Sequence, residues 1–253
     1  SNSNQLVGFQ AIMQDKLDMC GYPRIAAGQG GGHYRKPSMF FSVAGSSANK
    51  EAAADFLNFF IRDPEAVTIL GGAGVAGAHD ALIRLAGTLQ APVVHALRGK
   101  EFIEYDNPFD VGMTGLLGFA SGYKAIKEAD TLLMLGTDFP YQQFYPDDAK
   151  IIQVDIRGRH IGRRTPVDVG LVGTVADTLA ALEPLLAPKT DRTHLDRALR
   201  HYRTTRRRLD ELAVNDRDRT PIRPEYVAAL VDRLAADDAV FTCDVGSPVI
   251  WAA

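Results

Sequence analysis

The chain has 253 residues, of which 46% are hydrophobic and 23% charged, a balance that excludes a disordered or fibrous protein and allows one or two buried cores. Its formal net charge of -3 and its dispersed basic residues argue against a nucleic-acid partner. The two cysteines, Cys20 and Cys243, lie outside any metal-ligand spacing, so neither a disulfide framework nor a zinc site is indicated.

The chain has neither a membrane segment nor a signal sequence by its pattern. No stretch approaches the roughly 18 consecutive apolar residues of a membrane span, so we expect a cytoplasmic protein. The start, Ser1-Asn2-Ser3-Asn4, lacks Met, a charged region and an apolar core, which is typical of the interior of a longer protein.

Residues 1–66 differ in composition from the rest of the chain, with more Phe and Gly and fewer β-branched residues. Apolar spacing predicts a helix over residues 5–19, and the glycine-rich loop after it cannot continue that helix. The segment "NKEAAADFLNFFI" predicts an amphipathic helix with Phe56, Phe59 and Phe60 on its apolar side. We therefore expect a mostly helical N-terminal fragment in which no chemistry is visible.

From Val67 onward, short apolar runs alternate with amphipathic segments. The predicted strands cover 67–70, 92–97, 131–135, 151–156 and 167–173, and the predicted helices cover 79–90, 116–129 and 175–186. This alternation predicts an α/β domain over residues 67–187, with a five- or six-stranded parallel sheet and helices on both of its faces.

The residues after 187 predict linker helices and then the beginning of another domain. Region 188–238 contains a linker, a charged helix over 194–213 and an amphipathic helix over 223–236. The run Arg206-Arg207-Arg208 is interpreted as a solvated helix face in preference to a phosphate-binding patch. Residues 239–253 predict the first strand of a truncated domain.

The sequence "GAGVAG" that comes after the first predicted strand has the form G-x-G-x-x-G. Gly72 and Gly74 would let backbone N–H groups approach a pyrophosphate, although a tight strand-to-helix turn has the same pattern. An NAD site also needs an acidic residue after the second strand, where this chain has His95, Arg98 and Lys100. That difference argues against an NAD(P) dehydrogenase and makes Arg98 a candidate phosphate ligand.

Further candidate ligands stand where predicted strands end. Thr137 and Asp138 follow one strand and Asp155 closes the next, and open α/β sheets bind ligands at the carboxyl ends of their strands. Asp155 is a candidate contact to an adenosine ribose or base, with a structural capping role as the alternative. The loop "MTGLLG" adds backbone donors, so these loops together predict an extended, phosphate-containing ligand.

The histidines of this region do not predict a catalytic centre. His79, His95 and His160 have no nucleophile or carboxylate at motif spacing, and neither G-x-S-x-G nor H-E-x-x-H occurs. We expect no catalytic residue in this chain.

The run "HALRGKEFIEYDNPFDVGMTGLLGFASGYKAIKEADTLLMLGTDFPYQQFYPDDAKIIQVDI" closely resembles the central domain of the pyruvate oxidase and quinone-linked pyruvate dehydrogenase branch of thiamine diphosphate-dependent enzymes. The likeness runs from about Val67 to Ala253. It implies that the domain binds FAD, and that the enzyme decarboxylates pyruvate on thiamine diphosphate and Mg²⁺, passes electrons to a quinone and is a homo-oligomer. The contacts it implies, added to Gly72, Gly74 and Arg98, are Thr114, Gly115, Leu116, Leu117, Thr137, Asp138, Phe139, Pro140, Tyr141 and Asp155.

The resemblance also implies parts that we expect this chain to lack. The family's N-terminal domain supplies a Glu that activates thiamine, and its C-terminal domain supplies a Gly-Asp-Gly motif for magnesium and diphosphate, and neither is found here. The family's lipid-binding C-terminal segment is missing as well, and Gly158 stands where the family favours Pro. We therefore expect a truncated chain that is inactive alone.

Residues 1–66 resemble the C-terminal part of an extracellular solute-binding protein of an ABC importer, on the segment "SANKEAA" and the later "DPEA". The chain is therefore interpreted as two joined fragments that meet near residues 63–72. This predicts a strand at 67–70 and few contacts between residues 1–62 and the sheet. The alternative functions are a non-catalytic nucleotide-binding or structural module and a solute-binding fragment.

Overall fold

The computed structural model describes residues 66–214, 219–244 and 246–252. The predicted solute-binding-like fragment lies outside the described residues, apart from Ala66. The prediction that residues 1–62 contact the sheet poorly lies outside them as well.

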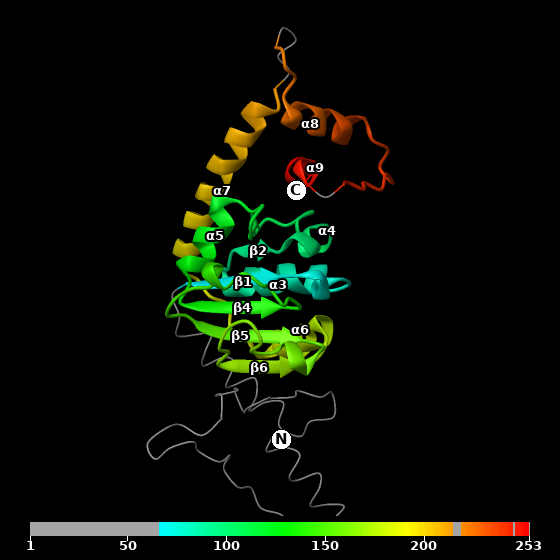
Figure 1. Ribbon diagram of the computed structural model, residues 1–253. Coiled ribbons are helices and arrows are strands. Elements are labelled where there is room, and N and C mark those ends of the chain that lie inside the picture. Colours follow the sequence, from blue (N-terminus) through cyan, green and yellow to red (C-terminus); the bar gives the residue numbers. More distant parts are fainter. Residues whose placement is uncertain (1–65, 215–218, 245, 253) are drawn as a thin grey trace, which may run out of the picture.

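Six parallel strands form one sheet in the order β3-β2-β1-β4-β5-β6 (Figure 1), which confirms the predicted α/β class. The strands are β1 Val67–Gly71, β2 Val93–His95, β3 Asp110–Met113, β4 Thr131–Leu135, β5 Lys150–Asp155 and β6 Val169–Val172. The strand predicted at 67–70 is therefore confirmed. The chain order turns back between the two central strands β1 and β4, which creates a crevice at their carboxyl ends.

Strand β3 is the one that the apolar pattern did not reveal. It contains Asp110 and Gly112, residue types that are depleted in strands, and Gly112 has a φ of 91° that only glycine adopts without strain. The Asp110 carboxylate accepts a hydrogen bond from the Gly112 amide, and the pairing of β2 with β3 shifts register between Val93 and His95. The strand is therefore held by contacts that a hydrophobic pattern does not record.

Helices cover both faces of the sheet, as predicted. Helices α3 His79–Leu89 and α6 Val175–Leu182 pack on one face, where Ile69 lies in the buried core. Helices α5 Ala120–Lys127 and α7 Thr193–Leu212 pack on the other, where Leu70 is buried. Because neighbouring residues of a central strand are buried on opposite faces, the strands consist of continuous apolar runs.

The connections contain short helical turns. These are η1 Ala73–Val75, η2 Leu97–Gly99, α4 Lys100–Ile103, η3 Gln142–Phe144, η4 Gly158–His160 and η5 Glu183–Leu185. Turns η1, η2 and η4 come shortly after strands β1, β2 and β5, so they lie at the end of the sheet where the crevice opens.

Helix α7 is more than a linker, because its first half completes the hydrophobic core. His194, Leu195, Ala198 and Leu199 are buried against the sheet and α5. Their spacing places them on one face of the helix. The predicted domain boundary at residue 187 therefore separates α7 from a sheet on which it packs.

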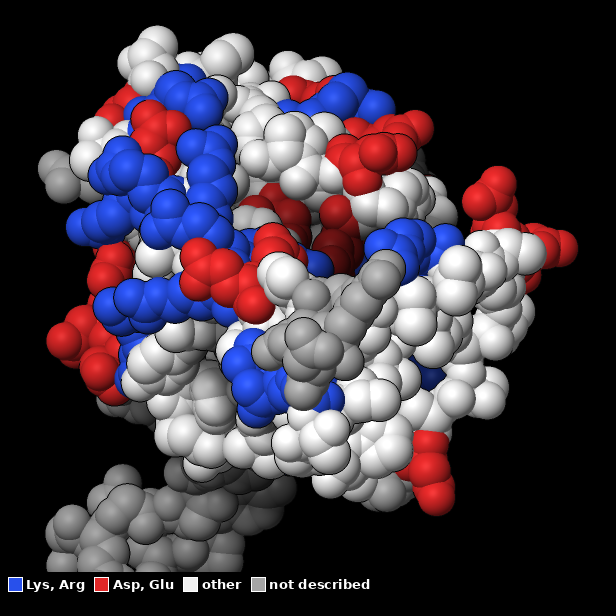
Figure 2. Space-filling view, turned by 90° about the horizontal axis from the view of Figure 1, so that it is seen from above, with Lys and Arg blue, Asp and Glu red and all other residues white. Residues whose placement is uncertain are grey.

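The second half of α7 is solvated, as its arginines predicted. Arg206, Arg207 and Arg208 are exposed, and Arg206 pairs with Asp210 at 3.0 Å. Figure 2 shows Lys and Arg gathered on the side where α7 lies in Figure 1, with Asp and Glu among them. This mixture of charges is typical of a solvated surface.

The chain beyond α7 packs loosely in the described residues. Helix α8 Pro224–Leu234 has no buried residue, and α9 Ser247–Ala252 comes after an extended segment. The strand predicted after residue 239 is not formed over 239–244, where Val240 and Phe241 are exposed and no neighbouring described strand pairs with them. A strand needs such a neighbour for its backbone hydrogen bonds. No described helix is long and apolar enough to cross a membrane.

Candidate functional site

A pocket of about 880 Å³ lies at the carboxyl ends of the strands, at the point where the strand order turns back. Its volume is at the upper end of the range for small-molecule sites, about 300–1,000 Å³. It is lined by every candidate contact predicted from the sequence, namely Gly72, Gly74, Arg98, Thr114, Gly115, Leu116, Leu117, Thr137, Asp138, Phe139, Pro140, Tyr141 and Asp155. Segments that are far apart in the sequence therefore form one site.

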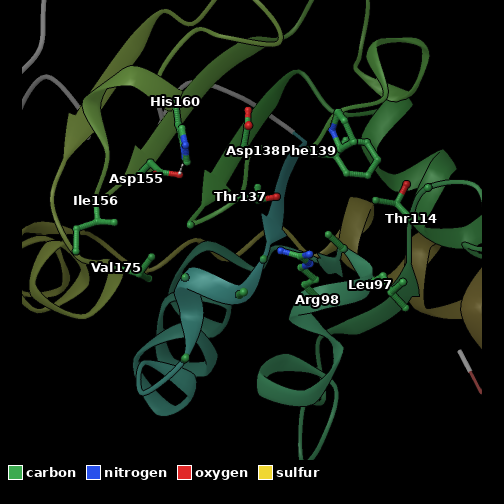
Figure 3. Close-up of a pocket in the computed structure, with 18 of the residues that line it drawn as sticks. Leu97, Arg98, Thr114, Thr137, Asp138, Phe139, Asp155, Ile156, His160 and Val175 are labelled. Atoms are coloured by element: carbon green, nitrogen blue, oxygen red, sulfur yellow. Dashed lines mark hydrogen bonds and ion pairs between the residues drawn. The ribbon is translucent and has the colours of Figure 1, made fainter. Parts of the chain in front are cut away.

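The pocket is elongated across the sheet edge (Figure 3). Asp155, Ile156, His160 and Val175 lie at one end and Leu97 and Thr114 at the other, with Arg98 and Thr137 between them. Such a shape suits an extended ligand more than a compact one.

The loop after β1 is a tight turn in which backbone carbonyls accept hydrogen bonds from most of the amides. The Gly72 amide donates to Leu135 O and the Gly74 amide to Gly136 O, both at 3.0 Å. The amides of Val75 and Ala76 donate to carbonyls inside the same turn. A Cβ on Gly74 would lie 2.6 Å from the Cα of Gly136, so close packing of two loops requires this glycine. The structure thus supports the turn interpretation of the G-x-G-x-x-G motif over the pyrophosphate cradle.

The loop after β3 has more free amide donors than the first loop among the described residues. The Thr114 hydroxyl is buried and has no hydrogen-bond partner among the described residues. In the same described part of the chain, the amides of Gly115, Leu116 and Leu117 donate to no other group. A buried polar group without a partner is unfavourable, and the Thr114 hydroxyl at the pocket wall is such a group.

Arg98 supplies positive charge in the middle of the pocket. It is exposed, and no described residue forms an ion pair or hydrogen bond with it. The nearby Asp138 is engaged elsewhere, because its carboxylate pairs with Arg163 at 3.2 Å and Arg164 at 3.1 Å and turns away from Arg98 (Figure 3). The centre of the pocket therefore favours an anionic group.

Asp155 holds the turn after β5 but does not cap a helix, because η4 has Arg157 as its N-cap and no side-chain cap bond. Its Oδ1 accepts a hydrogen bond from the Arg157 amide at 2.8 Å, and its Oδ2 lies 3.2 Å from Nδ1 of His160. The side chain also lines the pocket, so this turn bond and a ligand contact are compatible. His160, for which the sequence predicted no role in a site, lines the pocket as the partner of this carboxylate.

Several lining residues were not identified from the sequence. They are Ala73, Ala76, Ala96, Leu97, Met113, Gly136, Ile156, Arg157, His160, Gly173, Thr174 and Val175. Most of them come immediately after a strand, so extending the strand-end rule by two or three residues would have found them. Leu97, Leu116 and Ile156 are largely exposed, which gives the pocket an apolar rim.

The described residues contain no cluster of three or more His, Cys, Asp or Glu side chains arranged to hold a metal ion.

Residues 53–182 match the family model described as thiamine pyrophosphate enzyme, central domain; thiamine pyrophosphate is another name for thiamine diphosphate. The chain belongs to this family. The matched region includes the whole sheet and starts before Val67.

Three proteins from other organisms are similar in sequence to this chain. An uncharacterized 42.6 kDa protein of Pseudomonas amyloderamosa is 56% identical over 179 residues, covering 71% of this chain and 44% of that protein. The putative thiamine pyrophosphate-containing protein YdaP of Bacillus subtilis is 35% identical over 195 residues, covering 77% of this chain and 33% of that protein. A probable acetolactate synthase large subunit of Methanocaldococcus jannaschii is 31% identical over 210 residues, covering 76% of this chain and 34% of that protein.

The chain thus spans between a third and a half of the length of these relatives. The family model and the names of the second and third relatives support a thiamine pyrophosphate enzyme but not specifically the pyruvate oxidase branch of the family.

Proposed function

We propose that the pocket binds FAD and that the chain is the cofactor-binding central domain of a thiamine diphosphate-dependent flavoenzyme. The observation that carries this proposal is that every contact expected from the sequence lines one pocket at the turning point of the strand order. Ligands of open α/β sheets bind at this position.

The chemistry of the pocket suits the parts of FAD. The unpaired Thr114 hydroxyl, the free amides of residues 115–117 and the unpaired Arg98 suit phosphate and hydroxyl groups. The apolar rim at Leu97, Leu116 and Ile156 suits planar ring systems, which bury apolar surface. FAD supplies electron-transfer chemistry when bound, and the protein supplies its position.

For the whole protein, two activities are proposed. The resemblance over residues 95–156 favours pyruvate decarboxylation with electron transfer to a quinone, whereas one relative named as an acetolactate synthase favours that synthesis. Thiamine diphosphate and Mg²⁺ would be held outside this domain. Assays of the full-length protein with pyruvate decide between the two, because the first activity reduces a quinone analogue and the second forms acetolactate without it.

Titration of the purified chain with FAD tests the proposed binding. We expect the visible absorbance of bound flavin and a saturable change in flavin fluorescence. If no binding occurs at high micromolar FAD while circular dichroism shows a cooperative melt, the alternative of a structural or other nucleotide-binding module holds instead.

A matched pair of variants locates the ligand within the chain. Thr114 and Thr131 are both buried threonines whose hydroxyls lack a partner in the described residues, but only Thr114 lines the pocket. Thr114→Val should weaken FAD binding about tenfold, the cost of one lost hydrogen bond of roughly 1.4 kcal/mol. Thr131→Val should leave the affinity unchanged. Equal FAD affinities for the two variants would show that the Thr114 hydroxyl does not bind the ligand.

A further inference from the structure

A cluster of charged side chains lies beside the pocket and takes no part in lining it. His95, at the end of β2, is buried, and its Nδ1 lies 3.0 Å from Oδ1 of Asp110 on the neighbouring strand β3. Because a carboxylate only accepts hydrogen bonds, Nδ1 is the donor. This bond joins the two strands at the edge of the sheet.

The other ring nitrogen of His95 faces a second carboxylate. Its Nε2 has no hydrogen-bond partner among the described residues, but it lies 3.5 Å from Oε2 of Glu104. Glu104 in turn contacts Nζ of Lys100 from the same helical turn. Tyr202 of α7 completes the cluster, and burial, followed by the charges of Asp110 and Glu104, raises its pKa to about 12. The ring thus lies between two acids, one of which also contacts a lysine.

Such a cluster is a costly way to stabilise a sheet edge. Burying ionic groups requires removing their water, and apolar side chains of similar size often stabilise a fold as well or better. The central strands of this sheet bear buried apolar side chains on both faces, such as Leu70 on one face and Leu133 on the other. A directional bond at the β2–β3 edge can also fix the segments that leave these two strands.

The segments that leave β2 and β3 line one end and the centre of the pocket. Ala96, Leu97 and Arg98 come directly after His95, and Met113 to Leu117 end β3 and continue from it. The Thr114 amide donates to the His95 carbonyl at 2.9 Å, and the Gly112 amide donates to Oδ2 of Asp110 at 3.2 Å. Both pocket segments are therefore tied to the same His–Asp pair.

We propose that His95 is a positioning residue for the cofactor pocket: through its Nδ1 bond to Asp110 it holds the segment with Arg98 and the loop with Thr114 at the separation that the ligand requires. The proposal rests on the proposed binding of FAD for its ligand, but the arrangement of the two segments can be measured without any ligand.

Two variants of His95 separate positioning from simple packing. His95→Asn keeps a side-chain N–H near the position of Nδ1, and His95→Gln moves that N–H away from Asp110 while remaining polar. We expect the affinity for FAD to fall at least tenfold in His95→Gln and to stay within threefold of the original chain in His95→Asn. Leu182→Ala, in a buried position at the far end of α6, is the control for a general loss of stability.

Amide hydrogen exchange, measured without FAD, provides the second readout. The hydrogen-bonded amides of Ala96, Thr114 and Gly118 should exchange at least tenfold faster in His95→Gln than in His95→Asn, and the central strands should not differ. The proposal is overturned if the two His95 variants match in affinity and exchange, or if Leu182→Ala weakens FAD binding as much as His95→Gln. If the original chain binds no FAD, the proposed function fails, and the exchange comparison alone then decides the role of His95.

Discussion

Acidification should destabilise the domain through His194, whose hydrogen bonds leave no place for a second proton. The Thr68 hydroxyl donates to Ala125 O at 2.8 Å, so at the 2.9 Å contact between Thr68 Oγ1 and Nε2 of His194 the histidine must be the donor. The other nitrogen, Nδ1, lies 3.2 Å from Arg197, a guanidinium that only donates. His194 is therefore neutral, with its proton on Nε2.

Burial, and then the charge of Arg197, lower the pKa of His194 from 6.5 to about 4. Glu128, Asp130 and Lys189 also act on the ring, the two acids raising the pKa and the lysine lowering it. Between pH 6.5 and 4 the unfolded chain binds a proton that the folded chain excludes, so stability is complete above pH 6.5 and falls as the pH falls. At pH 4.5 the loss from this one group is about 2.5 kcal/mol, from 1.36 kcal/mol for each unit of pKa difference.

Urea denaturation at pH 7 and pH 4.5 measures this effect, with His194→Gln as the comparison. The glutamine amide can donate to Thr68 but cannot titrate, so the variant should lose about 2.5 kcal/mol less than the original chain on acidification. Subtracting the two chains removes the contribution of the carboxylates. An identical loss in both chains would refute the assignment of a neutral, buried His194.

Three further substitutions have expected outcomes. Gly74→Ala should lower the free energy of unfolding by about 2 kcal/mol, because its Cβ would lie 2.6 Å from the Gly136 Cα; an unchanged melting temperature would contradict this packing. Thr174→Ala should cost about 1 kcal/mol in a urea melt, since its hydroxyl accepts the Asp177 amide at the start of α6; a change of a few tenths would show that the cap is dispensable. Asp138→Asn should weaken FAD binding by less than about fivefold, because two arginines already engage its partly exposed carboxylate; a larger loss in a fluorescence titration would indicate direct contact with the ligand.

The sequence predicted the sheet well where burial alone determines a strand. Strands β1, β4 and β5 are almost completely buried, and their continuous apolar runs are visible without any structure. Strand β3 depends instead on the Asp110 side chain and on a glycine with positive φ, so no periodic pattern marks it. The buried first half of α7 was missed because its apolar face is short and precedes a long run of charged residues.

The candidate site was predictable because topology, rather than local sequence, brings its parts together. Once the strands are parallel, their carboxyl ends must lie at one edge, so Thr137 and Asp155 were expected to be neighbours of the first loop. Side-chain pairing was not predictable in the same way. The pairing of Asp138 with Arg163 and Arg164, and of His95 with Asp110, depends on loop paths that spacing does not record.

The glycine motif after β1 shows that a G-x-G-x-x-G sequence alone does not identify a phosphate-binding loop. The same residues that permit a ligand to approach a backbone also permit one loop to pack on another, and Gly72 and Gly74 serve the second purpose against Gly136 and Thr137. Their amides are already satisfied, whereas those of Gly115 and its neighbours are free among the described residues. If the pocket binds FAD, the loop after β3 and Arg98 should therefore bind its phosphates. The motif after β1 should act only by holding the shape of the pocket wall.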